Sequence, residues 1–373
     1  MDVLVVAGEA SGDQHAADVV RALQALRPDT RFFGMGGPKL AAAGVELVHG
    51  AHEISVMGIV EVLPKVPRIW KVLGDLEAAA KARKPSVALL VDVPDFNLRL
   101  AARLKKLGIP IVSFVAPMAW AWRESRTKII AERVDHLACI LPFEEKFFRD
   151  RGVNATYVGN PTVDQVPPPA PMGSFRSALS LPAEGPLLAV LPGSRKSEIF
   201  RIGPTLAAVA AKVIAARPTT RIVVPVAPGL DTDFVKVPFA AAGVAPLFIA
   251  GRAPEVVGAC DVALVASGTA TLEAGLMLRP LVAVYRVNAV SYAVGKLLVK
   301  IPFFSLVNLL SEQRVIPELL QGDMTAERIF AELEPLWAGP ARDTCIAGLE
   351  ALRARLGPGG AATRVAELLI RAC

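Results

Sequence analysis

The stretch DVALVASGTATLEAGL, residues 261–276, joins a short apolar run to a segment with helical spacing. The run Val262–Val265 predicts a buried strand, and Leu272 and Leu276 share one face of a helix because they stand four residues apart. Ser267–Thr269 then form the turn between strand and helix. Repetition of such a unit builds parallel sheets that are covered by helices on both faces.

This turn is suited to hold an anion. The first backbone N–H groups of a helix have no internal partner, and the helix macrodipole places partial positive charge there, so a phosphate fits at Ser267–Thr269. Glu273, one turn into the helix, is poorly placed for a phosphate and well placed for sugar hydroxyls. The alternative is a simple N-cap by Ser267 or Thr269, with Glu273 merely favoured in the first turn. The stretch alone leaves both interpretations open.

Short Val/Leu/Ile runs alternate with helical patterns along the whole chain. We expect strands at residues 3–6, 86–91, 109–115, 136–141, 186–191, 221–226, 246–250, 261–265 and 281–285. The sequence NPTVDQVPPPAPMGS at 160–174 predicts a linker, because its prolines cannot join a helix or a central strand. The length of 373 residues suits two domains, 1–165 and 175–355, each a doubly wound Rossmann-like α/β domain, facing each other across a cleft.

Composition narrows the possible classes of function. The chain is 53% hydrophobic, but its apolar runs are interrupted well short of the roughly 18 residues of a membrane span, and its N-terminus is unlike a signal peptide. We therefore expect a cytoplasmic protein. The four cysteines and four histidines lack metal-site spacing, which predicts no metal and no disulfide. The net charge of +6 favours an anionic partner, and the absence of clustered basic and stacking aromatic residues argues against nucleic acid.

The predicted loops of the second half favour a nucleotide diphosphate-sugar. Arg195 follows a glycine-serine turn in LPGSR, where its guanidinium could contact a diphosphate bidentately, and Arg286 could serve the same anion or only form a surface salt bridge. Neither the GxxxxGK[ST] pattern of P-loop NTPases nor the GxGxxG pattern of dinucleotide folds is present.

The predicted loops of the first half carry carboxylates. Asp92 ends its strand in DVPDFN, close to Asp95, and could take a proton from an acceptor hydroxyl. It could instead cap the following helix or pair with a lysine, and a close carboxylate pair would also suit a glycosidase. In GEASGDQ, which contains Glu9 and Asp13, the spacing of Ser11 and Gln14 predicts a capping box.

Two segments mix apolar and basic residues in a way that favours contact with a lipid or a membrane. Residues 55–76 place five apolar side chains at helical spacing, with the helix expected to begin near Pro64 and Pro67: Ile59, Leu63, Val66, Trp70 and Leu73. An ordinary amphipathic core helix is the alternative. YAVGKLLVKIPFF at 292–304 is the second such segment.

Eight motifs in this order resemble the lipid-A-disaccharide synthase family: VAGEASGD, VMGIVEVL, DVPDFN, PMAWAWR, LPFE, LPGSR, ASGTATLE and SLVNLL. The resemblance covers residues 3–330. It implies a GT-B fold, no metal or other cofactor, and transfer with inversion from UDP-2,3-diacylglucosamine to 2,3-diacylglucosamine 1-phosphate, which yields a β-1,6 disaccharide and UDP. It also implies peripheral association with an anionic membrane surface, the inner face of the inner membrane, and a final helix, 356–373, that returns to the first domain. The oligomeric state stays open.

The resemblance assigns roles to individual residues. Asp92 matches the catalytic carboxylate, and Glu9 and Ser11 line the same cleft. The residues that match the donor side are Arg195, Ser267, Gly268, Thr269, Ala270, Glu273 and Asn308. VMGIVEVL and the basic segment after it are expected to accept acyl chains.

Other functions stay open at this point. A different UDP-sugar enzyme, such as an undecaprenyl-linked N-acetylglucosaminyltransferase or an epimerase, would share the second domain. A non-catalytic, nucleotide-responsive membrane-binding protein would have no use for Asp92.

Overall fold

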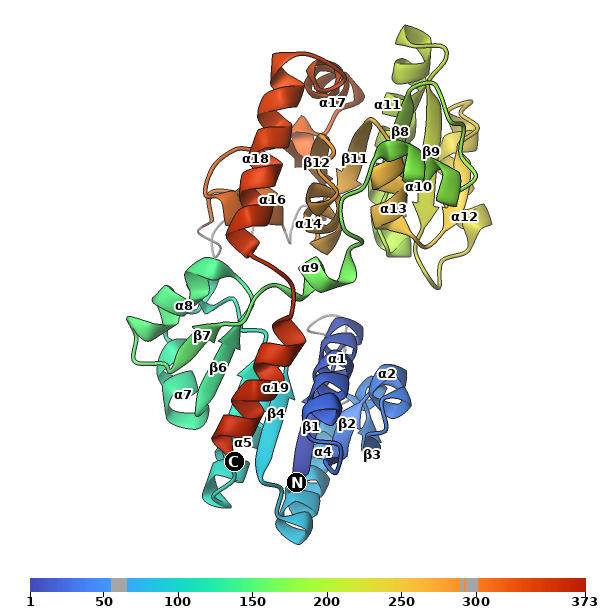
Figure 1. Cartoon of the computed structure of the whole chain (residues 1–373). Coiled ribbons are helices and arrows are strands. Elements are labelled where there is room, and N and C mark those ends of the chain that lie inside the picture. Colours follow the sequence, from blue (N-terminus) through green and yellow to red (C-terminus); the bar gives the residue numbers. More distant parts are fainter. Residues whose placement is uncertain (55–65, 289–291, 293–300) are drawn as a thin grey trace. The chain divides into compact units, whose positions relative to one another are not determined.

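The chain folds into two units, each built on its own parallel sheet (Figure 1). The computed structural model describes residues 1–54, 66–288, 292 and 301–373. Unit 1 comprises Met1–Pro161 and Pro358–Cys373, and unit 2 comprises Thr162–Gly357. The predicted fold class, α/β with doubly wound parallel sheets, is confirmed.

The sheet of unit 1 has seven strands in the order β3-β2-β1-β4-β5-β6-β7, and every pairing is parallel. The strands are β1 (Asp2–Ala7), β2 (Arg31–Gly36), β3 (Glu46–Gly50), β4 (Val87–Val91), β5 (Ile111–Phe114), β6 (His136–Cys139) and β7 (Ala155–Tyr157). The order reverses between β1 and β4, and ligands of doubly wound sheets bind beyond the carboxyl ends of strands at such a point. GEASGD follows β1 and DVPDFN follows β4.

Both faces of this sheet are buried. The helices of unit 1 are α1 (Ala10–Leu26), α2 (Pro38–Ala42), α4 (Val66–Arg83), α5 (Pro94–Lys106), α6 (Ala119–Trp122), α7 (Arg126–Arg133), α8 (Pro142–Arg149) and α19 (Ala361–Ala372). Leu4 and Val6 of β1 point to the face covered by α4 and α5. Val3 and Val5 point to the opposite face, covered by α1 and α19. Apolar burial on both faces explains why this strand reads as a continuous apolar run.

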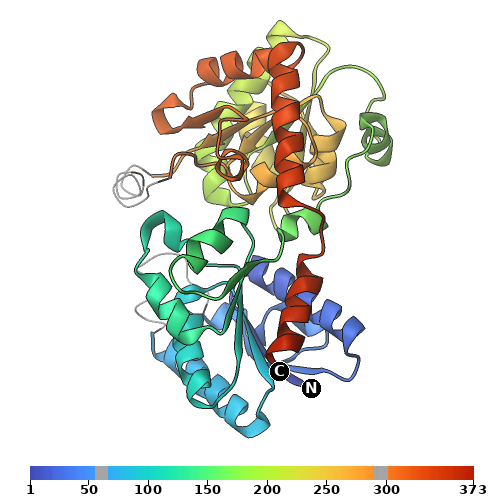
Figure 2. The ribbon, with the colours of Figure 1, turned by 60° about the vertical axis from the view of Figure 1, so that its left-hand side comes forward.

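The last helix, α19, therefore belongs to unit 1, where it packs beside α1 (Figure 2). Val365, Ala366 and Leu369 are buried in the same core as β1. The two chain termini also meet there, since Cys373 Sγ lies 3.6 Å from Met1 Sδ.

The sheet of unit 2 has six parallel strands in the order β10-β9-β8-β11-β12-β13. The strands are β8 (Leu187–Leu191), β9 (Arg221–Val226), β10 (Leu247–Ala250), β11 (Val262–Ala266), β12 (Leu281–Tyr285) and β13 (Glu318–Leu320). The helices are α10 (Met172–Ala178), α11 (Lys196–Ala216), α12 (Thr232–Ala241), α13 (Ala253–Ala259), α14 (Thr269–Leu276), α16 (Leu306–Ser311), α17 (Ala326–Leu333) and α18 (Pro340–Leu356). The order reverses between β8 and β11, whose following loops are LPGSR and ASGTATLE.

One expectation about the linker needs correction. The proline-rich segment 160–174 contains α9 (Pro161–Gln165) and the start of α10, so it is not free of helix. Pro161 is tolerated because it is the first helical residue, where a missing N–H leaves no bond unmade.

Within the described residues, α11 is the one helix long and apolar enough to span a membrane by length and composition. It packs buried residues such as Leu206 and Val213 on its own unit.

The predicted lipid-contact segments are only partly visible. Helix α4 begins at Val66, close to the start predicted from Pro64 and Pro67, and Pro67 is its second residue. Its core face is made by Val72, Leu73 and Leu76, whereas Trp70 is 48% exposed. Ile59, Leu63 and most of 292–304 lie outside the described residues.

Candidate functional site

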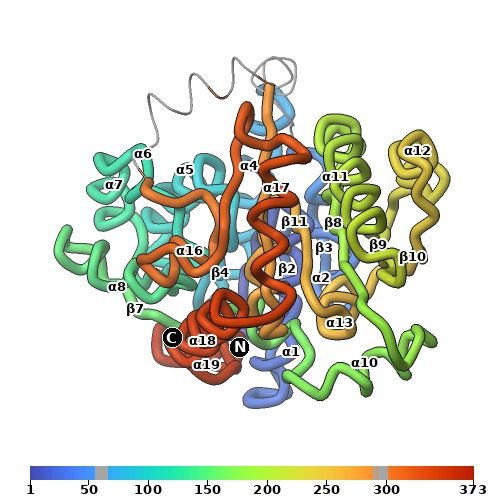
Figure 3. Tube along the Cα trace, turned by 90° about the horizontal axis from the view of Figure 1, so that it is seen from above, coloured from blue at the N-terminus to red at the C-terminus, as the bar shows by residue number. Residues whose placement is uncertain are grey.

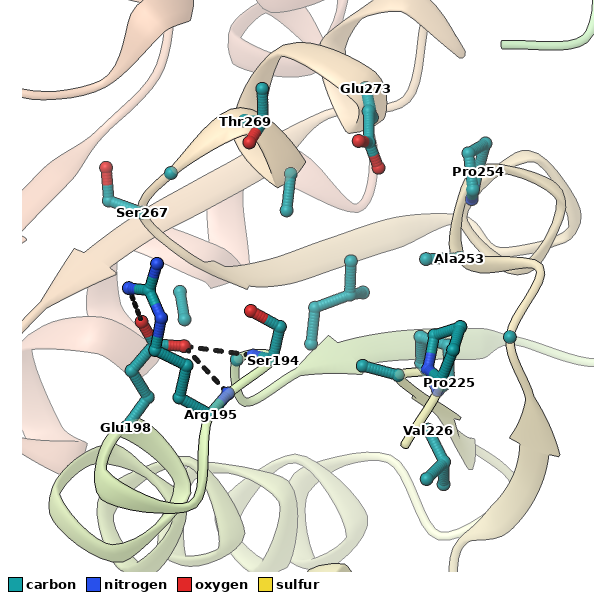
Figure 4. Close-up of a pocket in the computed structure, with 18 of the residues that line it drawn as sticks. Ser194, Arg195, Glu198, Pro225, Val226, Ala253, Pro254, Ser267, Thr269 and Glu273 are labelled. Atoms are coloured by element: carbon teal, nitrogen blue, oxygen red, sulfur yellow. Dashed lines mark hydrogen bonds and ion pairs between the residues drawn. The ribbon is translucent and has the colours of Figure 1, made fainter. Parts of the chain in front are cut away.

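A cavity of about 530 Å³ lies at the carboxyl end of the unit 2 sheet (Figure 4). Its walls come from the loops that follow β8, β9, β10 and β11, with Tyr285 from the end of β12. The lining side chains and loops are Leu191, Gly193–Arg195, Glu198, Pro225–Pro228, Gly251–Pro254, Ala266–Ala270, Glu273 and Tyr285. Its volume is typical of small-molecule sites. Six of the seven residues that the sequence assigned to the donor side line this one cavity.

The turn after β11 leaves its helix N-terminus open to the cavity. Gly268 is the N-cap of α14, and no side chain caps this helix. Ser267 Oγ donates to the carbonyl of Phe304 at 3.4 Å, and Thr271 Oγ1 donates to the carbonyl of Gly268 at 2.8 Å. The simple N-cap interpretation is therefore wrong, and the first N–H groups of α14 stay available for an anion.

Glu273 stands in the wall of the cavity, one turn along α14. Within the described residues its carboxylate has no hydrogen-bond or ion-pair partner, and burial raises its pKa above the ordinary value of a glutamate. A half-buried carboxylate of this kind gains from a ligand that donates hydrogen bonds to it. Vicinal hydroxyls of a sugar are such donors.

The LPGSR loop is shaped by Glu198. The backbone N–H groups of Ser194 and Arg195 donate to Glu198 Oε2 at 2.9 and 3.2 Å, and the Arg195 guanidinium donates to Oε1 at 3.1 Å (Figure 4). Gly193 has φ +117°, and a Cβ there would lie 2.6 Å from Glu198 Oε2, so only glycine fits. Arg195 is thus held by a carboxylate at the rim of the cavity while its side chain stays exposed. Sequence reasoning missed Glu198, although it stands three residues after Arg195, which is capping-box spacing.

Two further residues that the sequence analysis singled out, Asn308 and Arg286, are held by hydrogen bonds within unit 2. Asn308 is fully buried: its amide N–H groups donate to Ile316 and Glu318, and its oxygen accepts from the N–H groups of Val315 and Ile316. A donor contact through this side chain stays a prediction. Arg286 does not line the cavity and binds the carbonyl of Met324 at 2.6 Å.

In unit 1, Asp92 occupies a strained turn at the end of β4. Asp92 and Val93 have φ of +58° and +39°, a left-handed conformation that is costly for residues with side chains, above all for a β-branched one. Buried Asn97 holds the turn, because its amide donates to the carbonyls of Val91 and Asp92 at 3.1 and 2.6 Å. Strain of this kind concentrates at functional sites.

The carboxylate of Asp92 has one hydrogen bond among the described residues: Oδ1 accepts from the backbone N–H of Val93 at 3.1 Å. It does not cap α5, whose N-cap is Val93, and within the described part of the chain it forms no ion pair. Gly12 of α1 packs against it, since a Cβ at Gly12 would lie 3.2 Å from Asp92 Cβ. Burial lowers the pKa of His15, against the opposing effects of Asp18 and Asp92. His15 and Gly12 are neighbours of Asp92 that sequence reasoning did not single out.

The remaining residues of GEASGD divide into exposed and structural ones. Glu9 is the N-cap of α1, and both Glu9 and Ser11 are exposed at the start of this helix. The predicted capping box of Ser11 and Gln14 is wrong, because α1 has no side-chain cap and Gln14 donates to Asp18 at 2.8 Å. Asp13 is buried.

Asp13 caps a different helix from its own. Its carboxylate accepts from the N–H groups of Gly37, Lys39 and Leu40 at 2.7, 2.9 and 3.2 Å, that is, from the N-cap and the second and third residues of α2. Asp95, for its part, forms an ion pair with Arg126 at 2.6 Å. Asp92 therefore differs from Asp13 and Asp95: its carboxylate forms no ion pair among the described residues and accepts only the N–H of the adjacent Val93. Among the residues with assigned positions, no group of three or more His, Cys, Asp or Glu side chains could hold a metal ion.

Comparison with known proteins decides the family. Residues 3–345 match the model of the lipid-A-disaccharide synthetase family. The chain is 56% identical over 369 residues to the lipid-A-disaccharide synthase of Myxococcus xanthus, covering 99% of this chain and 96% of that protein. It is 53% identical to that of Anaeromyxobacter sp. strain K, with 98% and 96% covered.

The chain belongs to the lipid-A-disaccharide synthase family. It is therefore a glycosyltransferase of lipid A biosynthesis, as the resemblance in its motifs indicated. Solved structures share the fold at low identity. UDP-GlcNAc 2-epimerase from Neisseria meningitidis, bound to UDP-GlcNAc, matches with a TM-score of 0.65 at 12% identity over 100% of both chains. The calicheamicin glycosyltransferase CalG4 matches with a TM-score of 0.60 at 16% identity over 100% of this chain and 98% of the other. These two likenesses concern the GT-B-like fold alone.

Proposed function

We propose that the protein transfers a diacylglucosamine unit with inversion from UDP-2,3-diacylglucosamine to the 6-hydroxyl of 2,3-diacylglucosamine 1-phosphate. The products are the β-1,6-linked disaccharide 1-phosphate and UDP. The observation that carries the proposal is the unit 2 cavity. There an uncapped helix N-terminus, an arginine and a half-buried carboxylate without a partner among the described residues converge. Family membership supports the same substrates.

The cavity suits the diphosphate and the ribose of the UDP group. The N–H groups at Gly268–Ala270 and the guanidinium of Arg195 bind the diphosphate, while Glu273 accepts hydrogen bonds from the ribose hydroxyls. The diphosphate leaves as an anion, so the same donors stabilise the charge that develops on it in the transition state.

Asp92 acts as the general base. Its carboxylate takes the proton of the acceptor 6-hydroxyl, the hydroxyl oxygen forms a bond to the anomeric carbon, and the bond from that carbon to the diphosphate breaks with its electron pair going to UDP. One displacement inverts the anomeric carbon. Glu9 and Ser11, exposed at the start of α1, bind acceptor groups near Asp92.

The protein works at an anionic membrane surface, the cytoplasmic face of the inner membrane, as a peripheral protein. The net charge of +6 supports this attraction, as does exposed Trp70 of α4 with the guanidinium groups of Arg99 and Arg103 over its ring at 5.5 and 5.6 Å. An aromatic ring flanked by cations is a common interfacial anchor.

The linkage and stereochemistry of the product test the proposal. Purified protein is incubated with the two monosaccharide substrates, and the disaccharide is analysed by NMR. A β-1,6 linkage from an α-linked donor supports a single displacement. An α-linked product, or transfer to another hydroxyl, would refute the assignment of Asp92 as base for the 6-hydroxyl.

A further inference from the structure

An open apolar groove of about 490 Å³ runs between α11 and α12 on unit 2, and these helices lie side by side (Figure 3). Every residue that lines it is apolar, chiefly Ile199, Phe200 and Pro204 of α11 and Phe234, Val237 and Pro238 of α12. Phe200 is 78% exposed and Val237 62% exposed, the two most exposed large apolar side chains among the described residues. Neighbouring exposed apolar side chains mark a surface that binds something apolar.

The groove is built by close contact at its floor. A Cβ at Gly203 would lie 3.0 Å from Pro238 Cγ, so the two helices touch there. Phe200 and Pro204 stand four residues apart on α11, as Phe234 and Pro238 do on α12, and each pair lines one wall. Phe200 and Val237 stay exposed above the floor.

The groove begins where the donor cavity ends. Arg195 and Glu198 line the cavity, and the next two residues of the same helix turn, Ile199 and Phe200, line the groove. Lys196, between them, places its ammonium 5.8 Å from the centre of the Phe234 ring. A cation therefore stands at the groove end nearest the cavity, on the side where an anionic diphosphate would bind.

We propose that this groove receives an acyl chain of the donor. The inference rests on the proposed function, which puts the donor diphosphate at the start of α11 and so brings the acylated sugar beside Phe200. An acyl chain that packs against Phe200, Val237 and Pro204 is removed from solvent. Each methylene group buried in this way tightens binding of the donor about fourfold. The volume is in the range of a site for one apolar ligand group.

Donors with acyl chains of increasing length, all monomeric in water, test the groove. For the wild type, 1/KM for the donor should rise with each added methylene until the groove is filled. Phe200→Ser and Val237→Ser should raise KM for the long-chain donor about tenfold or more and flatten this dependence, with the inhibition constant of UDP unchanged. Leu247→Ser is the matched control, because Leu247 is an exposed apolar residue of the same unit outside the groove.

Each other outcome overturns the proposal in a recognisable way. Wild-type chain-length dependence in both groove variants, or an equal effect of Leu247→Ser, would show that the chain binds elsewhere. Unchanged donor KM with lost binding to phosphatidylglycerol vesicles would make the groove a bilayer contact, and a lower association state in the variants would make it a contact between copies. If the wild type forms no disaccharide with any donor, the proposed function fails and the groove assignment falls with it.

Discussion

Replacing Glu273 with alanine should weaken UDP binding by about tenfold to a hundredfold. Glu273 is half-buried in the cavity wall, it has no partner among the described residues, and burial raises its pKa. Each ribose hydroxyl that donates to it forms a hydrogen bond to a charged group, worth about 1.5–3 kcal/mol. One such bond lost gives the stated change in Kd.

The assay is isothermal titration of wild type and Glu273→Ala with UDP, uridine and inorganic diphosphate. The loss should be equal for UDP and uridine and absent for diphosphate, because only the nucleoside carries the ribose. Binding should also tighten as pH rises through the pKa of Glu273, since the ionised carboxylate is the better acceptor, and Glu273→Gln should remove that pH dependence. A loss confined to UDP and diphosphate, with uridine unaffected, would refute the ribose assignment.

Three further substitutions test other parts of the structure. Asp92→Asn should lower turnover about 10²- to 10⁴-fold with the Kd of UDP unchanged, and lost UDP binding would count against a role as base. Burial raises the pKa of Glu144 from 4.5 to about 7, so the wild type should lose about 3 kcal/mol of unfolding free energy as pH rises through that interval. Urea titrations of Glu144→Gln should lack that decline, and an identical decline would assign it to another group. Asp13→Ala should lower the unfolding free energy by about 3 kcal/mol, because three N–H groups at the start of α2, its N-cap included, lose a charged acceptor. A loss below about 1 kcal/mol in the same titrations would contradict the capping role.

The central strands of both sheets could be predicted from sequence, because strands buried on two faces read as unbroken apolar runs. The strands that were missed lie at or next to sheet edges. They are β2, β3, β7 and β13. β2 is the sequence RFFGMG, whose glycines weaken any strand signal, and β7 and β13 have three residues each. Their place in the sheet comes from pairing with neighbours, which a local pattern does not record.

For the candidate site, too, local features could be predicted from the sequence, and contacts between residues distant in sequence could not. The turn at Ser267–Thr269 was predictable because a strand, a glycine turn and a helix are consecutive in sequence. The role of Asp13 was not, because its partners at the start of α2 lie 24 to 27 residues away. The surroundings of Asn308 depend likewise on Glu318, ten residues on and in another element.

The most direct test of the account is turnover by the purified protein with UDP-2,3-diacylglucosamine and 2,3-diacylglucosamine 1-phosphate in mixed micelles with a chelator present, following UDP and disaccharide by mass. We expect one disaccharide for each UDP released, at a rate that the chelator does not change. UDP release without disaccharide, or no turnover of either substrate, would contradict it.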